Sequence, residues 1–440
     1  MYFKIHRGSH EIGGTCIEIL EGKYRLLLDL GLPLDADRDD AESLLPDIPD
    51  IFSDSPQHIT AIIISHAHQD HWGLSGHVED HVQVFASHGT IQLINTSKIF
   101  IRDMVVPKQV QEIQLDKTFA FGPFVVTPNL VDHSAPDALA FHITNTKTNM
   151  SLFYSGDFRN HGRKPGALSR LIKSVKRDGG ADLLLIEGTT LSRVSDSYPS
   201  ERDIQKRFYD KFQESENTTF VFSSGQNIDR WVSIYNAARD AGKTIIIDLY
   251  TAWVINSLRN LSDSFPKPGW KHGDGTYSVR TYYWKNHCDA LDAAGQEKFI
   301  LSNARYRIKI EELIEDPGGY VFMARSNRLI ELLIKRFSST EGMNIIWSLW
   351  SGYLNPPEHT SYKPSPIKLL AEKYQIPITH IHTSGHAGKN DILKLIEGID
   401  PQTIIPIHTE VPEAFLELDS RTRLLEDGVE YEMRELLRRD

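Results

Sequence analysis

The sequence predicts an α/β protein with two domains, one of which is split by the insertion of the other. The chain has 440 residues, and a compact domain holds roughly 150. Its first part contains short β-type runs separated by turns, with little helical periodicity. From about Glu201 onward, strand and helix patterns alternate, which is typical of a parallel sheet covered by helices.

The expected elements of the first part are short apolar or β-branched runs bounded by turn residues. We expect strands at residues 2–5, 16–20, 25–30, 59–64, 124–127, 152–154 and 183–186. The one helix expected there covers residues 90–100. This β-rich layout predicts a sheet-based domain.

The later elements alternate between the two periodicities. We expect strands at 219–222, 244–248, 377–382 and 403–407, and helices at 228–238, 328–337, 366–374 and 390–396. The predicted boundaries are 1–195 for the first part of the split domain, 196–362 for the inserted α/β domain and 363–440 for the second part.

The composition excludes several classes of protein. Apolar residues at 40% and charged residues at 24% argue against disorder and fibres. No apolar run reaches the roughly 18 residues of a membrane span. Two cysteines and a charged N-terminus favour the cytoplasm. The net charge of −11 argues against a long nucleic-acid footprint, although a local basic groove remains compatible with it.

The strongest motif is a cluster of His and Asp residues directly after the strand expected at 59–64. It reads His66-Ala-His68-Gln-Asp70-His71. Four ligand-type side chains within six residues can point into one pocket, and imidazoles with a carboxylate suit zinc. The alternative interpretation is a solvated polar turn, in a chain that contains 19 His.

This motif resembles the His-x-His-x-Asp-His signature of the metallo-β-lactamase superfamily. Three further acidic or His residues come in the order of that family: Asp29, His133 and Asp157. Each of these residues alone is weak evidence for the resemblance, because an Asp after a strand often belongs to a turn. Together they extend the resemblance, which implies an αββα sandwich for the split domain.

The resemblance also implies a role for each of these residues. His66, His68 and His133 would bind one metal ion, Asp70 and His71 the second, and Asp157 would bridge them. Asp29 would orient ligands by hydrogen bonding. The implied cofactors are two Zn²⁺ ions, with Mn²⁺ as the alternative. Two such ions activate a shared hydroxide for attack on an anionic phosphodiester.

Three later segments resemble the β-CASP nucleases, and most closely the ribonuclease J family. They contain Glu187 in Ile-Glu-Gly-Thr-Thr, His386 in His-Thr-Ser-Gly-His-Ala, and His408 in Pro-Ile-His-Thr-Glu. The segment from Arg7 to Gly14, Arg-Gly-Ser-His-Glu-Ile-Gly-Gly, is also similar to the family. The inserted domain would then be a β-CASP domain.

By position, His408 would complete the shell of the second metal ion. His386 would act as general acid for the leaving oxygen, and Glu187 would orient it and raise its pKa. With Asp70 and Asp29, these residues form the expected catalytic set. A His at the position of His408 is typical of the branch that acts on RNA.

The expected substrate contacts are His382, Ser384 and Gly385 near His386, and Ser224 and Asn227 in a loop between a strand and a helix. The alternatives are a core histidine, a simple turn and an ordinary helix cap. Arg159, Arg163 and Lys164 would line the substrate groove or form a solvated face. The expected Gly-Ser-Gln-Gly-Glu-type turn of the family is replaced by Met323–Arg328.

The predicted function is hydrolysis of single-stranded RNA by a zinc-dependent ribonuclease, with endonucleolytic and 5′–3′ exonucleolytic cleavage both open. Three alternatives remain: a DNA end as substrate, a small ester or phosphodiester, and a subunit of an RNA-processing complex. We expect no membrane partner, and the sequence leaves open a homodimer or an RNA-processing partner.

Overall fold

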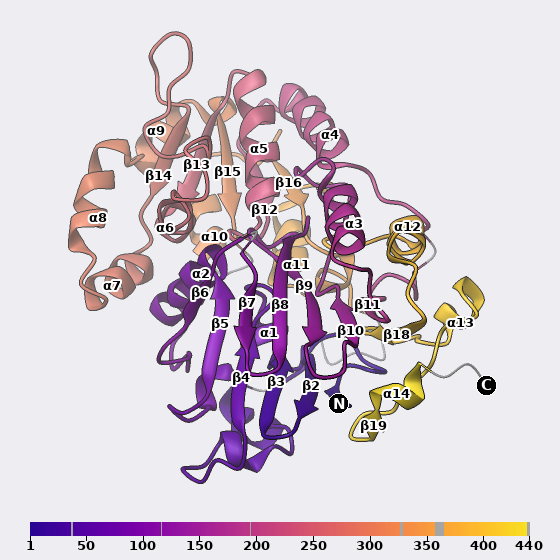
Figure 1. Ribbon diagram of the computed structural model, residues 1–440. Helices are drawn as coiled ribbons and strands as arrows, with labels where there is room; N and C mark the ends of the chain where they lie inside the picture. The colour runs from indigo at the N-terminus through magenta and orange to yellow at the C-terminus, as the bar shows by residue number, and fades with distance from the viewer. Residues whose placement is uncertain (37, 116, 194, 326–328, 357–364, 438–440) are drawn as a thin grey trace. The chain divides into compact units, whose positions relative to one another are not determined.

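A computed structural model describes the chain except for residues 37, 116, 194, 326–328, 357–364 and 438–440 (Figure 1). The chain forms two compact units. We call residues 1–98, 103–198 and 385–440 the sandwich unit, and residues 99–102 and 199–384 the parallel-sheet unit. None of the described helices is long and apolar enough to cross a membrane.

The sandwich unit contains two sheets. The first has the strand order β19-β1-β2-β3-β4-β5-β6 and the second β18-β11-β10-β9-β8-β7. The strands of the first are β1 (Tyr2–Arg7), β2 (Cys16–Glu21), β3 (Tyr24–Leu28), β4 (Ile59–Ile63), β5 (Gln83–Ser87), β6 (Gln111–Ile113) and β19 (Glu430–Glu432). Those of the second are β7 (Phe119–Phe121), β8 (Phe124–Leu130), β9 (Leu139–Asn145), β10 (Ser151–Tyr154), β11 (Leu183–Glu187) and β18 (Thr403–Ile407).

Helices pack around these sheets. They are α1 (Gln69–Trp72), α2 (His88–Phe100, whose last two residues group with the parallel-sheet unit), α3 (Ala167–Arg177), α12 (Lys389–Ile399), α13 (Ala414–Leu418) and α14 (Met433–Leu436), with 3₁₀ turns at Arg38–Leu44, Pro49–Ile51 and Ser75–His77. One apolar core lies between the sheets. Two others lie outside them, and one of these packs α3 and α12 against the second sheet. These four layers confirm the predicted αββα sandwich.

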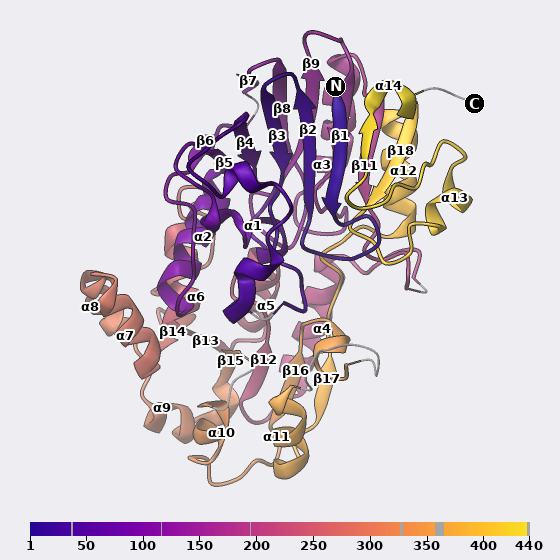
Figure 2. The same cartoon turned by 90° about the horizontal axis from the view of Figure 1, so that it is seen from below.

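The second part of the split domain returns to the second sheet. β18 pairs in parallel with β11, with Leu183 opposite Thr403, although these two residues are 220 positions apart in the chain. Figure 2 shows β18, in yellow, beside β11. The register brings the residues that follow both strands to one edge of the sheet.

The parallel-sheet unit has a single sheet with the order β14-β13-β15-β12-β16-β17, in which every pairing is parallel. Its strands are β12 (Thr219–Phe222), β13 (Thr244–Asp248), β14 (Val279–Tyr282), β15 (Tyr320–Ala324), β16 (Asn344–Trp347) and β17 (Ile378–His380). Its helices are α4 (Glu201–Glu214), α5 (Ile228–Asp240), α6 (Leu249–Ser257), α7 (Lys285–Ala293), α8 (Glu297–Asn303), α9 (Ile310–Glu315), α10 (Leu329–Ile334) and α11 (Pro366–Tyr374), with 3₁₀ turns at Ala304–Tyr306, Pro317–Gly319 and Ser351–Tyr353. Apolar clusters pack on both faces of the sheet.

The second domain boundary differs from the prediction at residue 363. The contacts place residues up to Ser384 in the parallel-sheet unit. The reason is that Ile367 and Leu370 of α11 belong to an apolar core of that unit. β17 also pairs with β16. Residues 365–384 therefore belong to the inserted domain.

A buried ion pair joins several elements of the parallel-sheet unit. Arg230 of α5 and Glu201 of α4 are both fully buried, with Nη2 and Oε1 3.0 Å apart. Arg230 also donates hydrogen bonds to the Ser348 carbonyl at 3.1 Å and to the Thr383 carbonyl at 3.3 Å. The pair thus links two helices to the segments that follow β16 and β17.

We expect Arg230→Met to lower the free energy of unfolding by about 3–5 kcal/mol, because it leaves the Glu201 carboxylate buried without its partner. Chemical denaturation measures the change. Arg239→Met, at an exposed position of the same helix, is the control and should stay close to wild type. An Arg230→Met protein as stable as that control would contradict this account.

Candidate metal centre

The candidate site forms where several strands of the sandwich unit end. β3 and β4 run parallel, so Asp29 and His66 leave them at the same edge of the first sheet. In the second sheet β10, β11 and β18 run parallel, and β8 has the same direction because β9 is antiparallel to both β8 and β10. Their ends deliver His133, Asp157, Glu187 and His408.

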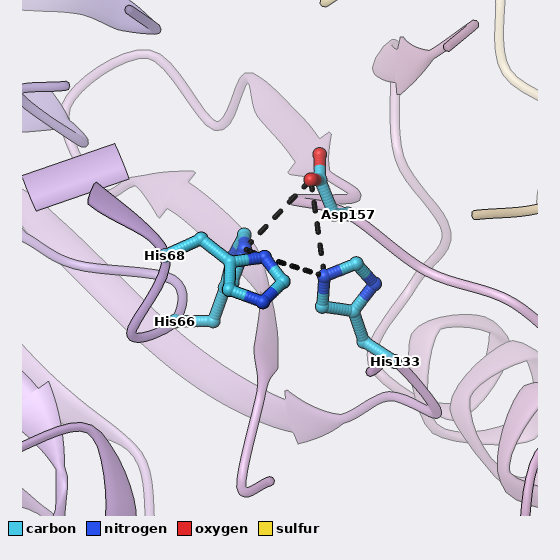
Figure 3. A group of neighbouring side chains, drawn as sticks. All are labelled: His66, His68, His133 and Asp157. Carbon is cyan, nitrogen blue, oxygen red and sulfur yellow. Dashed lines mark hydrogen bonds and ion pairs between the residues drawn. The ribbon is translucent and has the colours of Figure 1, made fainter. Parts of the chain in front are cut away.

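One group of possible metal ligands comprises His66, His68, His133 and Asp157 (Figure 3). Nδ1 of His68 lies 3.1 Å from Nε2 of both His66 and His133. The Asp157 Oδ2 atom lies 3.7 Å from His66 Nε2 and 4.0 Å from His133 Nε2. These separations suit one ion, since ligand atoms on a tetrahedral zinc with bonds of about 2.0–2.1 Å lie roughly 3.3 Å apart.

A second group comprises Asp70, His71 and His408. Nε2 of His408 lies 3.3 Å from Asp70 Oδ2, and Nε2 of His71 lies 3.8 Å from the same oxygen. Asp157 is close to this group too, with its Oδ2 atom 3.2 Å from His71 Nε2. The Asp157 carboxylate therefore lies between the two groups.

Several buried polar atoms in this centre have no hydrogen-bond partner among the described residues. They are both carboxylate oxygens of Asp157 and Nε2 of His71. Burying such atoms without partners is unfavourable. A cation between the His and Asp side chains would satisfy them, so the residues present fit a divalent metal ion.

The charge states of the first group also fit a metal ion. Burial lowers the pKa of His66 and His133 well below the usual range, and the charges of neighbouring His rings add to the effect. Burial lowers the pKa of His68 to about 4. All three imidazoles are therefore neutral near pH 7, which is the form that binds metal.

The second group concentrates negative charge. Burial opposes ionisation of Asp157, but His408 and His71 outweigh it and hold its pKa well below the usual range. Asp70 has a pKa of about 2 because His71 and His408 likewise overcome its burial. The pKa of His71 is raised in spite of burial by Asp157, Asp70 and Asp29. A divalent cation would be stabilised by the same carboxylates.

Asp29 has the geometry expected of an orienting carboxylate. Its Oδ2 atom accepts a hydrogen bond from His71 Nδ1 at 2.7 Å, which leaves Nε2 of that ring facing Asp157. Ser65 donates to Asp29 through its backbone N–H at 2.6 Å and its hydroxyl at 2.7 Å, and the Tyr154 hydroxyl donates at 2.5 Å. These contacts fix the orientation of the carboxylate.

Two other histidines are oriented through their second ring nitrogen. His133 Nδ1 donates to the Gly385 carbonyl at 2.7 Å. His408 Nδ1 lies 2.8 Å from the Thr189 hydroxyl, and the His408 backbone N–H donates to Gly8 O at 2.6 Å. In both rings Nε2 faces the other possible ligands. Such outer contacts fix the tautomer and the ring orientation of a metal ligand.

Glu187 and His386 form a further pair beside Asp157. His386 Nδ1 lies 3.1 Å from Glu187 Oε2 and 3.6 Å from Asp157 Oδ2. Burial lowers the pKa of His386, but Glu187 and Asp157 outweigh this and raise it above the usual value. These residues and His408 also form a third group of possible ligands.

Arg159 has a different place from the one predicted. It is buried rather than in a groove or on a solvated face, and its Nε lies 3.3 Å from Asp132 Oδ1. Its backbone N–H donates to Asp132 O at 2.6 Å. Asp132 precedes His133 and Arg159 lies two residues after Asp157, so this ion pair connects two loops that bear possible ligands.

Gly385 lies in the sandwich unit, where its carbonyl receives the hydrogen bond of His133. A Cβ atom at Gly385 would approach the Ser134 hydroxyl to 2.7 Å. A side chain at this position would therefore disturb the support of His133. The structure gives Gly385 this supporting contact, while its contact with substrate remains a prediction.

The other predicted substrate contacts, Ser224, Asn227, His382 and Ser384, belong to the parallel-sheet unit. The Asn227 side chain caps α5 by accepting from Arg230 N–H at 3.0 Å. His382 is partly buried, and burial together with Arg230 lowers its pKa well below the usual range. Part of the unusual 323–328 segment, residues 326–328, lies outside the described residues.

Sequence analysis missed three supporting residues: Ser65, Tyr154 and Thr189. Each lies within three positions of a predicted site residue, either just before it or just after it in the chain. Their hydroxyls contact Asp29 or His408. All three lie at or just after the end of a strand, which could have indicated a place in the site. Hydroxyl side chains at strand ends are too common, however, for this position alone to identify them.

Comparisons with known proteins agree with this geometry. Residues 41–202 match the family described as a beta-lactamase superfamily domain, and residues 375–421 match the Zn-dependent metallo-hydrolase RNA specificity domain. Ribonuclease J of Mycolicibacterium smegmatis is 25% identical over 412 residues, which cover 91% of this chain and 67% of that protein. Ribonuclease J of Sinorhizobium meliloti is 21% identical over 83% of this chain and 60% of that protein.

A solved structure shows the same fold. It is the crystal structure of a protein of unknown function from Enterococcus faecalis V583, with a TM-score of 0.76 and 22% sequence identity. The similarity covers 98% of this chain and 99% of that one. Residues 41–202 therefore form a domain of the beta-lactamase superfamily. The chain as a whole is similar to ribonuclease J.

We expect Asp29→Asn to weaken metal binding about 10–100-fold, because an amide can no longer accept every hydrogen bond that orients His71. Titration of the metal-free protein with Zn²⁺, followed by calorimetry, measures the change. Asp47→Asn replaces an exposed carboxylate of the same unit and should bind Zn²⁺ like wild type. Equal affinities for the two variants would contradict the orienting role of Asp29.

Proposed function

We propose that this chain is a metal-dependent hydrolase that cleaves RNA phosphodiester bonds. The observation that carries the proposal is the position of Asp157, which belongs to the first ligand group and whose Oδ2 atom lies 3.2 Å from His71 Nε2 of the second. The match of residues 375–421 to an RNA specificity domain and the similarity to ribonuclease J over 91% of the chain support RNA as the substrate class.

We further propose that zinc is the metal. The first group offers three neutral imidazoles and one carboxylate, a donor set that suits Zn²⁺ better than Mg²⁺ or Ca²⁺. When bound, two such ions would supply Lewis-acid activation of water and stabilisation of the charge that develops on phosphate. His66, His68 and His133 would hold one ion, Asp70, His71 and His408 the other, with Asp157 shared.

We assign proton donation to His386. Its Nδ1 faces the Glu187 carboxylate at 3.1 Å, so the hydrogen bond fixes the ring and leaves Nε2 to give a proton to the leaving oxygen of the RNA. Phe158 N–H donates to Glu187 Oε1 at 2.8 Å, which holds the carboxylate in place. Glu187 is thus a positioning residue for His386.

The choice of leaving group tests this assignment. An RNA 3′-oxygen needs a proton as it departs, whereas p-nitrophenolate is stable without one. We expect His386→Gln to lower kcat for RNA by about 10²-fold or more. Hydrolysis of bis-p-nitrophenyl phosphate should fall much less, and the metal content should stay at wild type.

The matched control is His88→Gln. His88 lies in the sandwich unit and contacts Glu112 at 3.0 Å, as His386 contacts Glu187, but it belongs to none of the ligand groups. The His88→Gln variant should hydrolyse RNA and bis-p-nitrophenyl phosphate like wild type. A His386→Gln protein that loses both activities equally, together with metal, would identify His386 as a ligand instead of an acid.

The substrate class is tested with a matched set of nucleic acids. We expect wild-type protein to cut single-stranded RNA, and Asp157→Ala to be inactive because it removes the carboxylate that lies between the two ligand groups. Gel analysis of 5′-monophosphate, 5′-triphosphate and circular RNA reports whether cleavage starts at an end or internally. A metal-loaded wild type that cuts only single-stranded DNA, or no nucleic acid, would overturn the proposal.

A further inference from the structure

Two clusters of aromatic and basic side chains lie beside β14, the edge strand of the parallel-sheet unit. Residues next to the 3₁₀ turn at Ala304–Tyr306 run alongside this strand: Thr281 and Arg307 form a parallel bridge, and the Ile308 N–H donates to the Thr281 carbonyl at 2.9 Å. We call Lys271, Tyr277, Tyr283, Arg305, Tyr306 and Arg307 the aromatic–basic strip.

Each cation of the strip lies over a tyrosine ring. The Arg305 guanidinium carbon lies 4.7 Å from the Tyr306 ring centroid. The Arg307 guanidinium carbon lies 5.1 Å from the centroid of Tyr283. Lys271 Nζ lies 5.6 Å from the ring centroid of Tyr277. These cation–π contacts keep each positive charge next to an aromatic ring.

The rings themselves are fixed by the surrounding structure. Tyr277 and Tyr306 meet edge to face, with centroids 5.3 Å apart. A Cβ atom at Gly269 would approach the Tyr306 ring to 2.6 Å, so the glycine permits this close packing. The Tyr283 hydroxyl donates to the Ile300 carbonyl at 2.8 Å. Contacts within the protein therefore hold the tyrosine rings of the aromatic–basic strip in place.

The cations of the strip are available to a ligand. Lys271, Arg305 and Arg307 are exposed. Within the part of the chain that the structure describes, none of the three makes an ion pair or a side-chain hydrogen bond. Arg280, by contrast, is neutralised by Glu312 at 2.6 Å. The three free cations thus differ from their paired neighbour.

The local charge also differs from that of the whole chain. Residues 267–309 contain eight Lys and Arg against four Asp and Glu, in a protein with a net charge of −11. One of these acids, Asp274, accepts hydrogen bonds from the Thr276 N–H at 2.9 Å and hydroxyl at 2.7 Å in its own loop. This segment therefore carries a net positive charge, and three of its eight cations belong to the strip.

We propose that the aromatic–basic strip binds single-stranded RNA as a site separate from the metal centre. The inference deepens the proposed function, on which it rests for the identity of the nucleic acid. Unpaired bases stack on aromatic rings and on guanidinium planes, while the cations contact phosphates. An acidic peptide would use the cations but not the half-buried tyrosine rings.

The test measures the affinity of the full-length, metal-loaded protein for a labelled oligouridylate with phosphorothioate linkages, by fluorescence anisotropy. We expect Arg305→Ala/Arg307→Ala to bind about tenfold more weakly, because it removes two stacking cations. The slope of log affinity against log salt should fall by about 1.4, since each phosphate contact on a single strand contributes about 0.7.

The matched control is Arg239→Ala. Arg239 is also exposed, with its guanidinium carbon 5.8 Å from the Tyr235 centroid, but it is paired with Asp240 at 2.7 Å. The Arg239→Ala variant should bind RNA like wild type. Arg305→Lys/Arg307→Lys keeps the charge and loses the planar stack, so it should retain the salt slope while binding more weakly than wild type.

Hydrolysis of bis-p-nitrophenyl phosphate should be unchanged in all these variants, which separates the strip from the metal centre. A double alanine variant that binds RNA as tightly as Arg239→Ala would overturn the inference, as would an equal loss of affinity for oligoglutamate. If wild type binds the oligouridylate through the strip but cuts no RNA, the proposed function fails while the strip remains an RNA-binding surface.

Discussion

The structure of the candidate centre depends on one buried carboxylate. Asp157 lies between the two ligand groups, and both its oxygens are buried without a hydrogen-bond partner among the described residues. Burying a charge in this way costs several kcal/mol unless an opposite charge lies next to it. Burial keeps three of the His rings around Asp157 neutral, whereas the pKa values of His71 and His386 are raised. A divalent cation between the two ligand groups would satisfy both oxygens of Asp157.

The fold provides the arrangement through strand direction. Parallel pairing of β10, β11 and β18 brings Asp157, Glu187 and His408 to one edge, although they come from distant parts of the sequence. Hydrogen bonds to Asp29, Thr189 and the Gly385 carbonyl then set which ring nitrogen faces inward. The sheets thus determine where the possible metal ligands lie, and hydrogen bonds determine how their rings are oriented.

Much of the sandwich was predictable because its apolar runs follow strand periodicity and its ligands follow strand ends. The helix α3 was missed, although Leu168, Leu171 and Val175 have helical spacing and are buried. The boundary at 363 was wrong because no composition change marks the end of the inserted sheet, whose last strand is only Ile378–His380. The boundary depends on which strand pairs with which and in what register, and a single sequence does not reveal strand pairing.

The roles of individual polar residues were harder to predict than their positions. Arg159 looked like a surface cation, but tertiary packing buries it against Asp132. Asn227 fits its alternative interpretation as a helix cap. A sequence shows which side chains carry charge, while burial and partners come only from the folded chain.

Anomalous X-ray scattering from crystals of the zinc-loaded protein tests the central claim most directly. The account predicts two zinc peaks, one contacting His66, His68 and His133 and the other contacting Asp70, His71 and His408, with the Asp157 carboxylate between them. No peak in either ligand group, or a single ion held by Glu187 and His386, would contradict it.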